Sequence, residues 1–162
     1  MKDADIELIY QFNSSLETLK YVCRDLYTDL NQAKNRYEEF KKHYLEQKAI
    51  WWVIEQKTDQ LKLGYCGLFN MAHGPKSAEI GYGILKPFWR KGIASETITA
   101  LISYGIHSLE LHRIHASITP ENLGSIKALV NNGFTLEGQL KDVDFARNQY
   151  FDRLIYAYLN VS

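Results

Sequence analysis

The stretch from residue 78 to residue 119 constrains the fold of this chain more than any other. Residues 78–86 (AEIGYGILK) alternate as a strand does, residues 92–109 carry apolar side chains at helical spacing, and residues 112–119 form a second short strand. A strand–helix–strand unit returns the chain to the same sheet and makes its two strands parallel. The fold must therefore contain a sheet with a crossover helix packed on it.

The remaining segments add antiparallel strands and further helices to this unit. Residues 49–57 and 61–70 are rich in aromatic and β-branched residues and predict a hairpin. Further patterns predict two closing strands over 134–143 and 149–159, and three more helices over 13–26, 31–44 and 122–133. We therefore predict an α+β (mixed α/β) fold in one domain, residues 1–162, with a mostly antiparallel twisted sheet and about four helices.

Charge and composition exclude several classes of protein. The 19 Lys and Arg residues balance the 19 Asp and Glu residues, which argues against a general binder of nucleic acid or anionic membranes. The longest apolar run, AIWWVI, is too short to span a bilayer, and the acidic start is not that of a signal peptide. With only two cysteines and no metal-like spacing, we expect a soluble, reduced protein of the cytoplasm.

Residues 90–95 (RKGIAS) join the first strand of the crossover to its helix. The first amides of a helix have no internal partner and carry partial positive charge. Arg90 and Lys91 add cations, Gly92 leaves the backbone open and Ser95 offers a hydroxyl donor. The stretch therefore suits a pyrophosphate. The alternative interpretation is a solvated helix start with ordinary cations.

A second group of polar residues follows the second strand of the crossover. Asn122 and Ser125 lie three residues apart at the start of the next helix, so both can face the same side. Since the two strands are neighbours, a ligand held at residues 90–95 can run between them towards this pair. The alternative role of Asn122 is to cap its helix.

Several motifs in a fixed order resemble the GCN5-related N-acetyltransferases (GNAT), in particular the ribosomal-protein-alanine acetyltransferase (RimJ/RimL-type) branch. They are AEIGYGI, PFWRKGIASE, LHRIHASITPENLGSIKALVNNGF, and EGQLKD followed by YFDRLIYAYL. The similarity runs from about residue 49 to the C-terminus, and WRKGIA matches the family's pyrophosphate loop.

The resemblance implies an acetyl-CoA-dependent N-acetyltransferase that moves an acetyl group to a primary amine by direct attack in a ternary complex. It also implies a sheet that splays between strands 78–86 and 112–119. Loop amides would hold the pyrophosphate and a strand edge would pair with the pantetheine arm. The implied cofactor-binding residues are Ile84, Leu85, Arg90, Lys91, Gly92, Ile93, Ala94, Ser95 and Asn122. Ser125 would stabilise or protonate the leaving thiolate.

Two departures from the family pattern leave alternatives open. Many members have a tyrosine general acid where this chain has Leu129, and the first strand of the family is missing or very short here. A second hypothesis is therefore a CoA-binding or regulatory module of the same fold with little or no turnover. A third is an interaction domain whose helix start only resembles an anion site.

Glu79 is the candidate base. Free amines are mostly protonated near neutral pH, so acetyl transfer needs a group that accepts a proton. Glu79 lies on the strand face of Gly81 and Gly83, where a ligand could approach; the alternative is a solvated carboxylate.

His112 and His115 are interpreted as surface histidines, without a metal site. The sequence does not decide whether the acceptor is a protein N-terminus or a small amine, and it does not decide whether the protein forms a homodimer.

Overall fold

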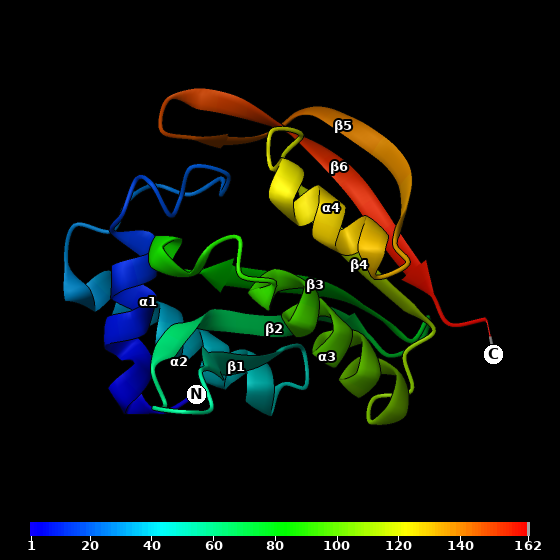
Figure 1. The fold of residues 1–162 in the computed structure, drawn as a ribbon, viewed down its shortest axis with the longest axis horizontal. Coiled ribbons are helices and arrows are strands. Elements are labelled where there is room, and N and C mark those ends of the chain that lie inside the picture. Colours follow the sequence, from blue (N-terminus) through cyan, green and yellow to red (C-terminus); the bar gives the residue numbers. More distant parts are fainter. Residues whose placement is uncertain (162) are drawn as a thin grey trace.

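The computed structural model describes residues 1–161 and contains one six-stranded sheet with helices on both faces (Figure 1). Its strands are β1 (Ile50–Glu55), β2 (Lys62–Ala72), β3 (Ser77–Ile84), β4 (Arg113–Ile118), β5 (Thr135–Ala146) and β6 (Gln149–Leu159). Its helices are α1 (Ile6–Asn13), α2 (Leu30–Leu45), α3 (Ile93–His107) and α4 (Leu123–Asn131), with 3-10 turns at Asp3–Asp5 and Lys86–Phe88. The predicted α+β class is confirmed.

The sheet opens between its two central strands. The strand order is β1-β2-β3-β4-β6-β5; β3 and β4 run parallel, and every other pair in the described sheet is antiparallel. β3 and β4 pair only from Ser77 with Arg113 to Glu79 with His115. Beyond Glu79 and His115 the two strands no longer pair with each other. From there on, β4 pairs only with β6, and β3 pairs only with β2. The predicted splay is therefore present.

Two apolar cores lie on the two faces of the sheet. On one face, α3 and α4 cover a core in which Leu68, Ile98, Ile114 and Leu129 are at most 1% exposed. On the other face, α1 and α2 pack their apolar sides into a core that includes four buried aromatic residues, Phe12, Tyr37, Phe40 and Tyr65. Burying one such aliphatic side chain contributes about 1.5–3 kcal/mol, so both cores hold the central strands in place.

The helix predicted over residues 13–26 is wrong. The helix lies earlier, over Ile6–Asn13, and the residues that follow form turns. Asn13 is fully buried; its Nδ2 donates to Ile9 O and to Tyr65 Oη, and its Oδ1 accepts from Arg24. These bonds end the helix at Asn13. Leu19 then reaches the core from a turn, which helical spacing alone could not reveal.

The glycine face of β3 is covered by aromatic rings. A Cβ at Gly83 would lie 2.4 Å from the Phe12 ring, and one at Gly81 would lie 2.9 Å from the Phe69 ring. The two glycines therefore admit core side chains from α1 and β2. These rings fill the space over Gly81 and Gly83 in which a ligand was expected, while Glu79 on the same face keeps 17% of its side chain exposed.

Candidate active site

The open edge of β3 presents backbone groups that the sheet does not use. Leu85 N–H donates to Leu63 O on β2 at 2.8 Å, and alternate residues of an antiparallel strand turn to the opposite side. The N–H groups of Tyr82 and Ile84 and the C=O of Tyr82 therefore face the gap. The C=O of Ile84 accepts from Trp89 Nε1 at 2.6 Å. This edge can take an extended ligand as an additional strand.

Leu85 differs from its predicted role in this pairing. Its N–H is used by Leu63, and its C=O accepts from Phe88 N–H at 3.0 Å. Both backbone groups of Leu85 are therefore occupied within the chain. Tyr82, which was not predicted, takes its place in the free edge because it is the other residue of the strand end that faces the gap.

The start of α3 has the geometry of an anion site. Gly92 caps the helix at φ +79°, and Arg90 is also left-handed at φ +61°. The first intrahelical hydrogen bond is the one that Glu96 N–H donates to Gly92 O at 3.1 Å. The preceding amides, those of Ile93 and its two successors Ala94 and Ser95, point out of the helix end without intrahelical partners. A Cβ at Gly92 would meet nothing within 4 Å, so the space above these amides is open.

Asn132 fixes the Ser95 hydroxyl and was missed by sequence reasoning. Its Nδ2 donates to Ser95 Oγ at 2.9 Å, and its Oδ1 accepts from Thr99 Oγ1 at 2.6 Å. The sequence placed Asn132 only within the helix predicted over residues 122–133. Because Asn132 ends α4 and Ser95 begins α3, this side chain locks the two helices on either side of the gap.

Asn122 and Ser125 lie at the first turn of α4, as predicted. Asn122 Oδ1 accepts from Ser125 N–H at 3.2 Å, so Asn122 caps the helix and keeps its amide N–H groups for other partners. Burial raises the pKa of the Tyr82 phenol, and a hydrogen-bonding interaction with the Ser125 side chain opposes this shift, so the two side chains lie near each other. The structure thus brings α4 and β3 together across the gap.

Glu79 and His115 lie where β3 and β4 separate. Glu79 Oε2 accepts from Asn70 Nδ2 at 3.0 Å and lies 3.7 Å from His115 Nε2. The side chains of Glu79 and His115 are 17% and 26% exposed, so His115 is not the surface residue predicted from the sequence. Burial lowers the pKa of His115, and the Glu79 carboxylate opposes this shift. A carboxylate and a neutral imidazole therefore share this point.

Comparisons with known proteins identify the family of this chain. The model of the acetyltransferase (GNAT) domain matches residues 1–135. The uncharacterized N-acetyltransferase p20 of Bacillus licheniformis is 37% identical over 161 residues, covering 98% of this chain and 88% of that protein. The chain belongs to the GNAT acetyltransferase family.

Two further relatives of this acetyltransferase bear on its fold and branch. The ribosomal-protein-serine acetyltransferase of Escherichia coli K12 is 38% identical over 101 residues, which cover 62% of this chain and 56% of that protein. The crystal structure of spermidine N-acetyltransferase from Vibrio cholerae in complex with CoA and spermine has a TM-score of 0.87 at 23% identity, covering 98% and 92% of the two chains. The chain is an N-acetyltransferase that uses acetyl-CoA to acetylate amines.

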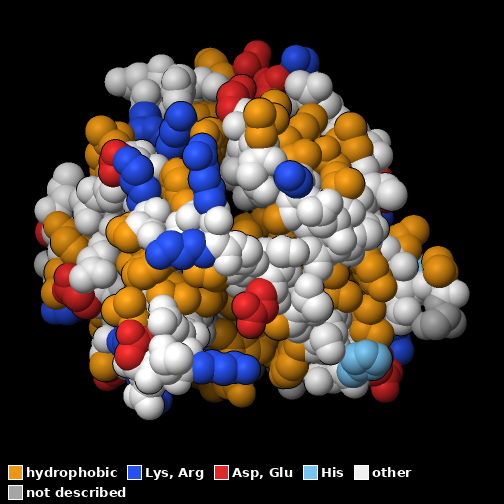
Figure 2. Space-filling view, in the orientation of Figure 1, with side chains coloured by type: hydrophobic (Ala, Val, Ile, Leu, Met, Phe, Trp, Pro, Cys, Tyr) orange, Lys and Arg blue, Asp and Glu red, His pale blue; other side chains and the backbone are white. Residues whose placement is uncertain are grey.

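The surface charge of the acetyltransferase suits this anionic cosubstrate. Figure 2 shows Lys and Arg side chains gathered over the loop after α1, the tip of the β5–β6 hairpin and the segment that leads into α3. These segments carry Lys20, Arg24, Lys86, Arg90, Lys91 and Arg147. A chain without net charge has thus concentrated cations beside its helix start, which favours a ligand with several phosphate groups.

The loop after α1 bridges the two halves of the open sheet. Thr119 Oγ1, at the end of β4, donates to Tyr21 O at 3.1 Å, and Glu17 forms an ion pair with Lys86 just after β3. Arg147, at the hairpin turn, donates through Nη1 to Val22 O at 2.8 Å. Residues 14–29 therefore form a wall across the gap on the α1–α2 side (Figure 1).

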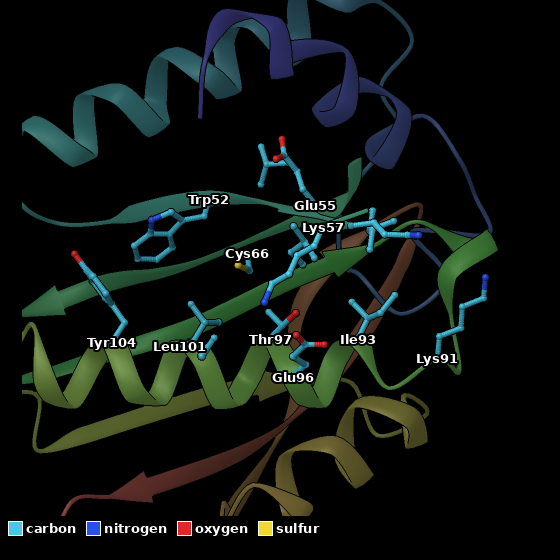
Figure 3. Close-up of a pocket in the computed structure, with 15 residues that line it drawn as sticks. Trp52, Glu55, Lys57, Cys66, Lys91, Ile93, Glu96, Thr97, Leu101 and Tyr104 are labelled. Atoms are coloured by element: carbon cyan, nitrogen blue, oxygen red, sulfur yellow. The ribbon is translucent and has the colours of Figure 1, made fainter. Parts of the chain in front are cut away.

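A cavity among the described residues lies outside this gap. It has a volume of about 740 Å³ and lies between α3 and strands β1 and β2, with Trp52, Cys66, Leu101 and Tyr104 on its walls (Figure 3). None of the described residues that line it comes from β4 or α4. It shares Lys91 and Ile93 with the anion site and otherwise lies apart from the gap. Nothing about it identifies a ligand.

Within residues 1–161, no group of three or more His, Cys, Asp or Glu side chains is placed to hold a metal ion. No described helix is long and apolar enough to cross a membrane.

Proposed function

We propose that this GNAT acetyltransferase, one domain over residues 1–162 and of the RimJ/RimL type, acetylates the N-terminal amine of a protein or peptide by direct attack in a ternary complex. The observation that carries the proposal is the separation of β3 and β4 directly after Glu79 and His115. It leaves a free strand edge with a helix N-terminus at one end and a half-buried carboxylate at the other.

The grip on acetyl-CoA is proposed from this geometry. When bound, acetyl-CoA supplies an activated acetyl group and a thiol leaving group. The amides from Arg90 to Ser95 would hold the pyrophosphate, with the Arg90 and Lys91 side chains adding charge. The edge groups of Tyr82 and Ile84 would pair with the pantetheine arm, and the Asn122 amide would donate to it. Ser125 would face the sulfur.

Glu79 is proposed to take the proton of the acceptor amine, directly or through one water molecule. Its 17% exposure leaves it reachable, and Asn70 fixes one of its oxygens. His115 is held neutral by burial and so does not form a competing ion pair with Glu79 at neutral pH. The carboxylate therefore keeps its capacity to accept a proton from an ammonium group.

The charge around the loop wall supports an acceptor with a single amine. Asp25 Oδ1 already accepts Arg147 N–H at 2.8 Å, and Asp144 Oδ2 pairs with Arg153 Nε at 2.5 Å. A polyamine carries several cations that each need a carboxylate, whereas a peptide N-terminus carries one. Similarity to a ribosomal-protein-serine acetyltransferase supports the same choice.

The test measures free thiol release from acetyl-CoA with three acceptors. They are a short peptide with a free N-terminal Ser or Ala, the same peptide with a blocked N-terminus and one internal Lys, and spermidine. We expect kcat/KM for the free N-terminus to exceed the other two at least 10-fold, about 1.4 kcal/mol of discrimination. Faster turnover of spermidine would overturn the acceptor assignment.

Calorimetry with acetyl-CoA separates the remaining hypotheses. Binding without thiol release from any amine would favour a CoA-binding module of the same fold. No binding at millimolar acetyl-CoA would reject the proposed grip as well.

A homodimer in the cytoplasm is proposed as the working form. Exposed apolar side chains follow β5 and β6, including Leu136, Val143, Phe145 and Tyr150, at 48–66% exposure. Such a row supports a contact with a second copy, and two free cysteines support a reducing compartment. Light scattering that gives the mass of one chain at all concentrations would reject the dimer.

A further inference from the structure

Tyr82 carries a hydroxyl group that the fold does not use. Its ring packs against the core under α3 and α4. Its Oη is buried and has no hydrogen bond of normal geometry to any described residue. A buried polar group without a partner destabilises a fold, so each one in a native structure asks for an explanation.

The neighbour of this hydroxyl is Ser125. Tyr82 comes from β3 and Ser125 from the first turn of α4, so the two side chains meet across the gap that is proposed to hold the pantetheine arm. Burial raises the pKa of the Tyr82 phenol, and a hydrogen-bonding interaction with the Ser125 side chain opposes this shift, which places the two hydroxyls near each other. The pair falls outside normal hydrogen-bond geometry, since Tyr82 Oη has no partner by that criterion. A small rotation of either hydroxyl would bring the pair to normal geometry.

The free Ser125 side chain has a competing partner. A serine in the first turn of a helix can turn its hydroxyl back to a carbonyl three or four residues earlier, and the Asn122 carbonyl, which accepts from Ile126 N–H, lies three residues before Ser125. In that rotamer Ser125 could not serve a ligand in the gap. A donor on the opposite wall would hold the serine oxygen towards the gap instead, and Leu129, buried in α4, provides no hydroxyl for this purpose.

We propose that Tyr82 is the positioning residue for the leaving-group side of the reaction: its O–H donates to Ser125 Oγ, which leaves the Ser125 O–H to donate to the sulfur. The inference rests on the proposed placement of Ser125 at the sulfur. In the transfer step the amine nitrogen bonds to the carbonyl carbon, the carbon–sulfur bond breaks and the sulfur keeps the electron pair. The amine proton goes to Glu79 and then to solvent, and neither hydroxyl loses its proton.

The acidity of Tyr82 shows why it acts as a donor of a hydrogen bond and not of a proton. Burial raises the pKa of Tyr82 to about 12, and no charged side chain contributes to this shift. A thiol ionises at about 8.5, so a full proton transfer from this phenol to a thiolate would be unfavourable. The phenol instead stays protonated throughout the working range, and two linked hydrogen bonds polarise each other towards the sulfur.

The experiment compares Tyr82→Phe, Ser125→Ala and the double variant, with Tyr104→Phe as control. Tyr104 is 38% exposed and lies in the cavity beyond α3, so loss of its hydroxyl should leave turnover unchanged. The measurements are kcat with the peptide acceptor, the Kd of acetyl-CoA by calorimetry, and the midpoint of urea unfolding of the free protein.

The expected pattern cannot come from a purely structural role. Tyr82→Phe removes an unpaired hydroxyl, so the unfolding midpoint stays equal or rises, while kcat falls about 10- to 100-fold. The Kd of acetyl-CoA changes less than about threefold, because the arm and pyrophosphate contacts remain. The double variant is no slower than Ser125→Ala, since the two residues act as one unit.

Three outcomes would overturn the inference. They are wild-type turnover in Tyr82→Phe, effects of the two substitutions that multiply in the double variant, and an unfolding midpoint that falls enough to explain the lost activity. A Ser125→Ala variant with wild-type turnover would instead reject the proposed place of Ser125, with the activity of the enzyme itself left standing.

Discussion

Replacing Glu79 with Gln is expected to lower kcat about 100-fold at pH 7, the scale on which a general base contributes. The amide keeps the size of the side chain and can still accept from Asn70, but it cannot take a proton from the amine. The Kd of acetyl-CoA should stay within about threefold of the wild-type value, because Glu79 is not among the residues proposed to contact acetyl-CoA. Steady-state kinetics with a peptide acceptor and calorimetry measure the two quantities.

The pH dependence of this defect gives a sharper criterion. An α-amino group loses its proton at a pKa of about 8, so above that value the acceptor needs no base. The ratio of wild-type to Glu79→Gln turnover should therefore shrink as the pH rises from 7 to 9. Glu110→Gln is the matched control, because Glu110 is a 78% exposed carboxylate paired with Lys76. A ratio near one at every pH would remove Glu79 from the mechanism.

Local sequence patterns were sufficient to predict the strand–helix–strand unit, because the secondary structure of each of its elements follows from its own residues. Alternation over β3 and helical spacing over α3 agree with the burial that the structure shows, and the parallel pairing follows from the connection. The open helix start with its cations was also predictable, since Gly92 and the cations beside it are contiguous in the chain. Such features need no knowledge of distant contacts.

The features that the sequence did not predict depend on contacts between residues far apart in the chain. The turns after Asn13 depend on a buried amide that bonds to Tyr65, 52 residues away, and this contact overrides helical spacing. The sequence alone predicts His115 as a surface residue. Its partial burial depends on its pairing with Glu79 on the neighbouring strand. Tyr82 follows the alternation of a core residue, and only the packing of α4 against β3 reveals that its hydroxyl is unpaired.

The substitution Gly92→Asp is expected to raise the Kd of acetyl-CoA about 100-fold. A carboxylate about 4 Å from a phosphate group is repelled by about 4 kcal/mol at an effective dielectric constant of 20, and salt reduces this figure. The free protein should lose about 1–2 kcal/mol, because a side chain at φ +79° is strained although a Cβ meets nothing within 4 Å. Asp tolerates this left-handed backbone better than most residues, and its carboxylate interacts favourably with the helix dipole. Weaker binding together with an unfolding free energy within about 2 kcal/mol of wild type is therefore the expected combination.

Gly92→Asn separates charge from size at the same position. Asn matches Asp in shape and in its tolerance of positive φ, so its variant should weaken binding only by the bulk of the side chain, about 10-fold or less. The difference between the two variants should narrow as salt is raised, because only the charge is screened. Equal affinities of the Asp variant and the wild type would mean that the pyrophosphate does not lie on the first amides of α3, and the cations gathered around that helix start would then need another ligand.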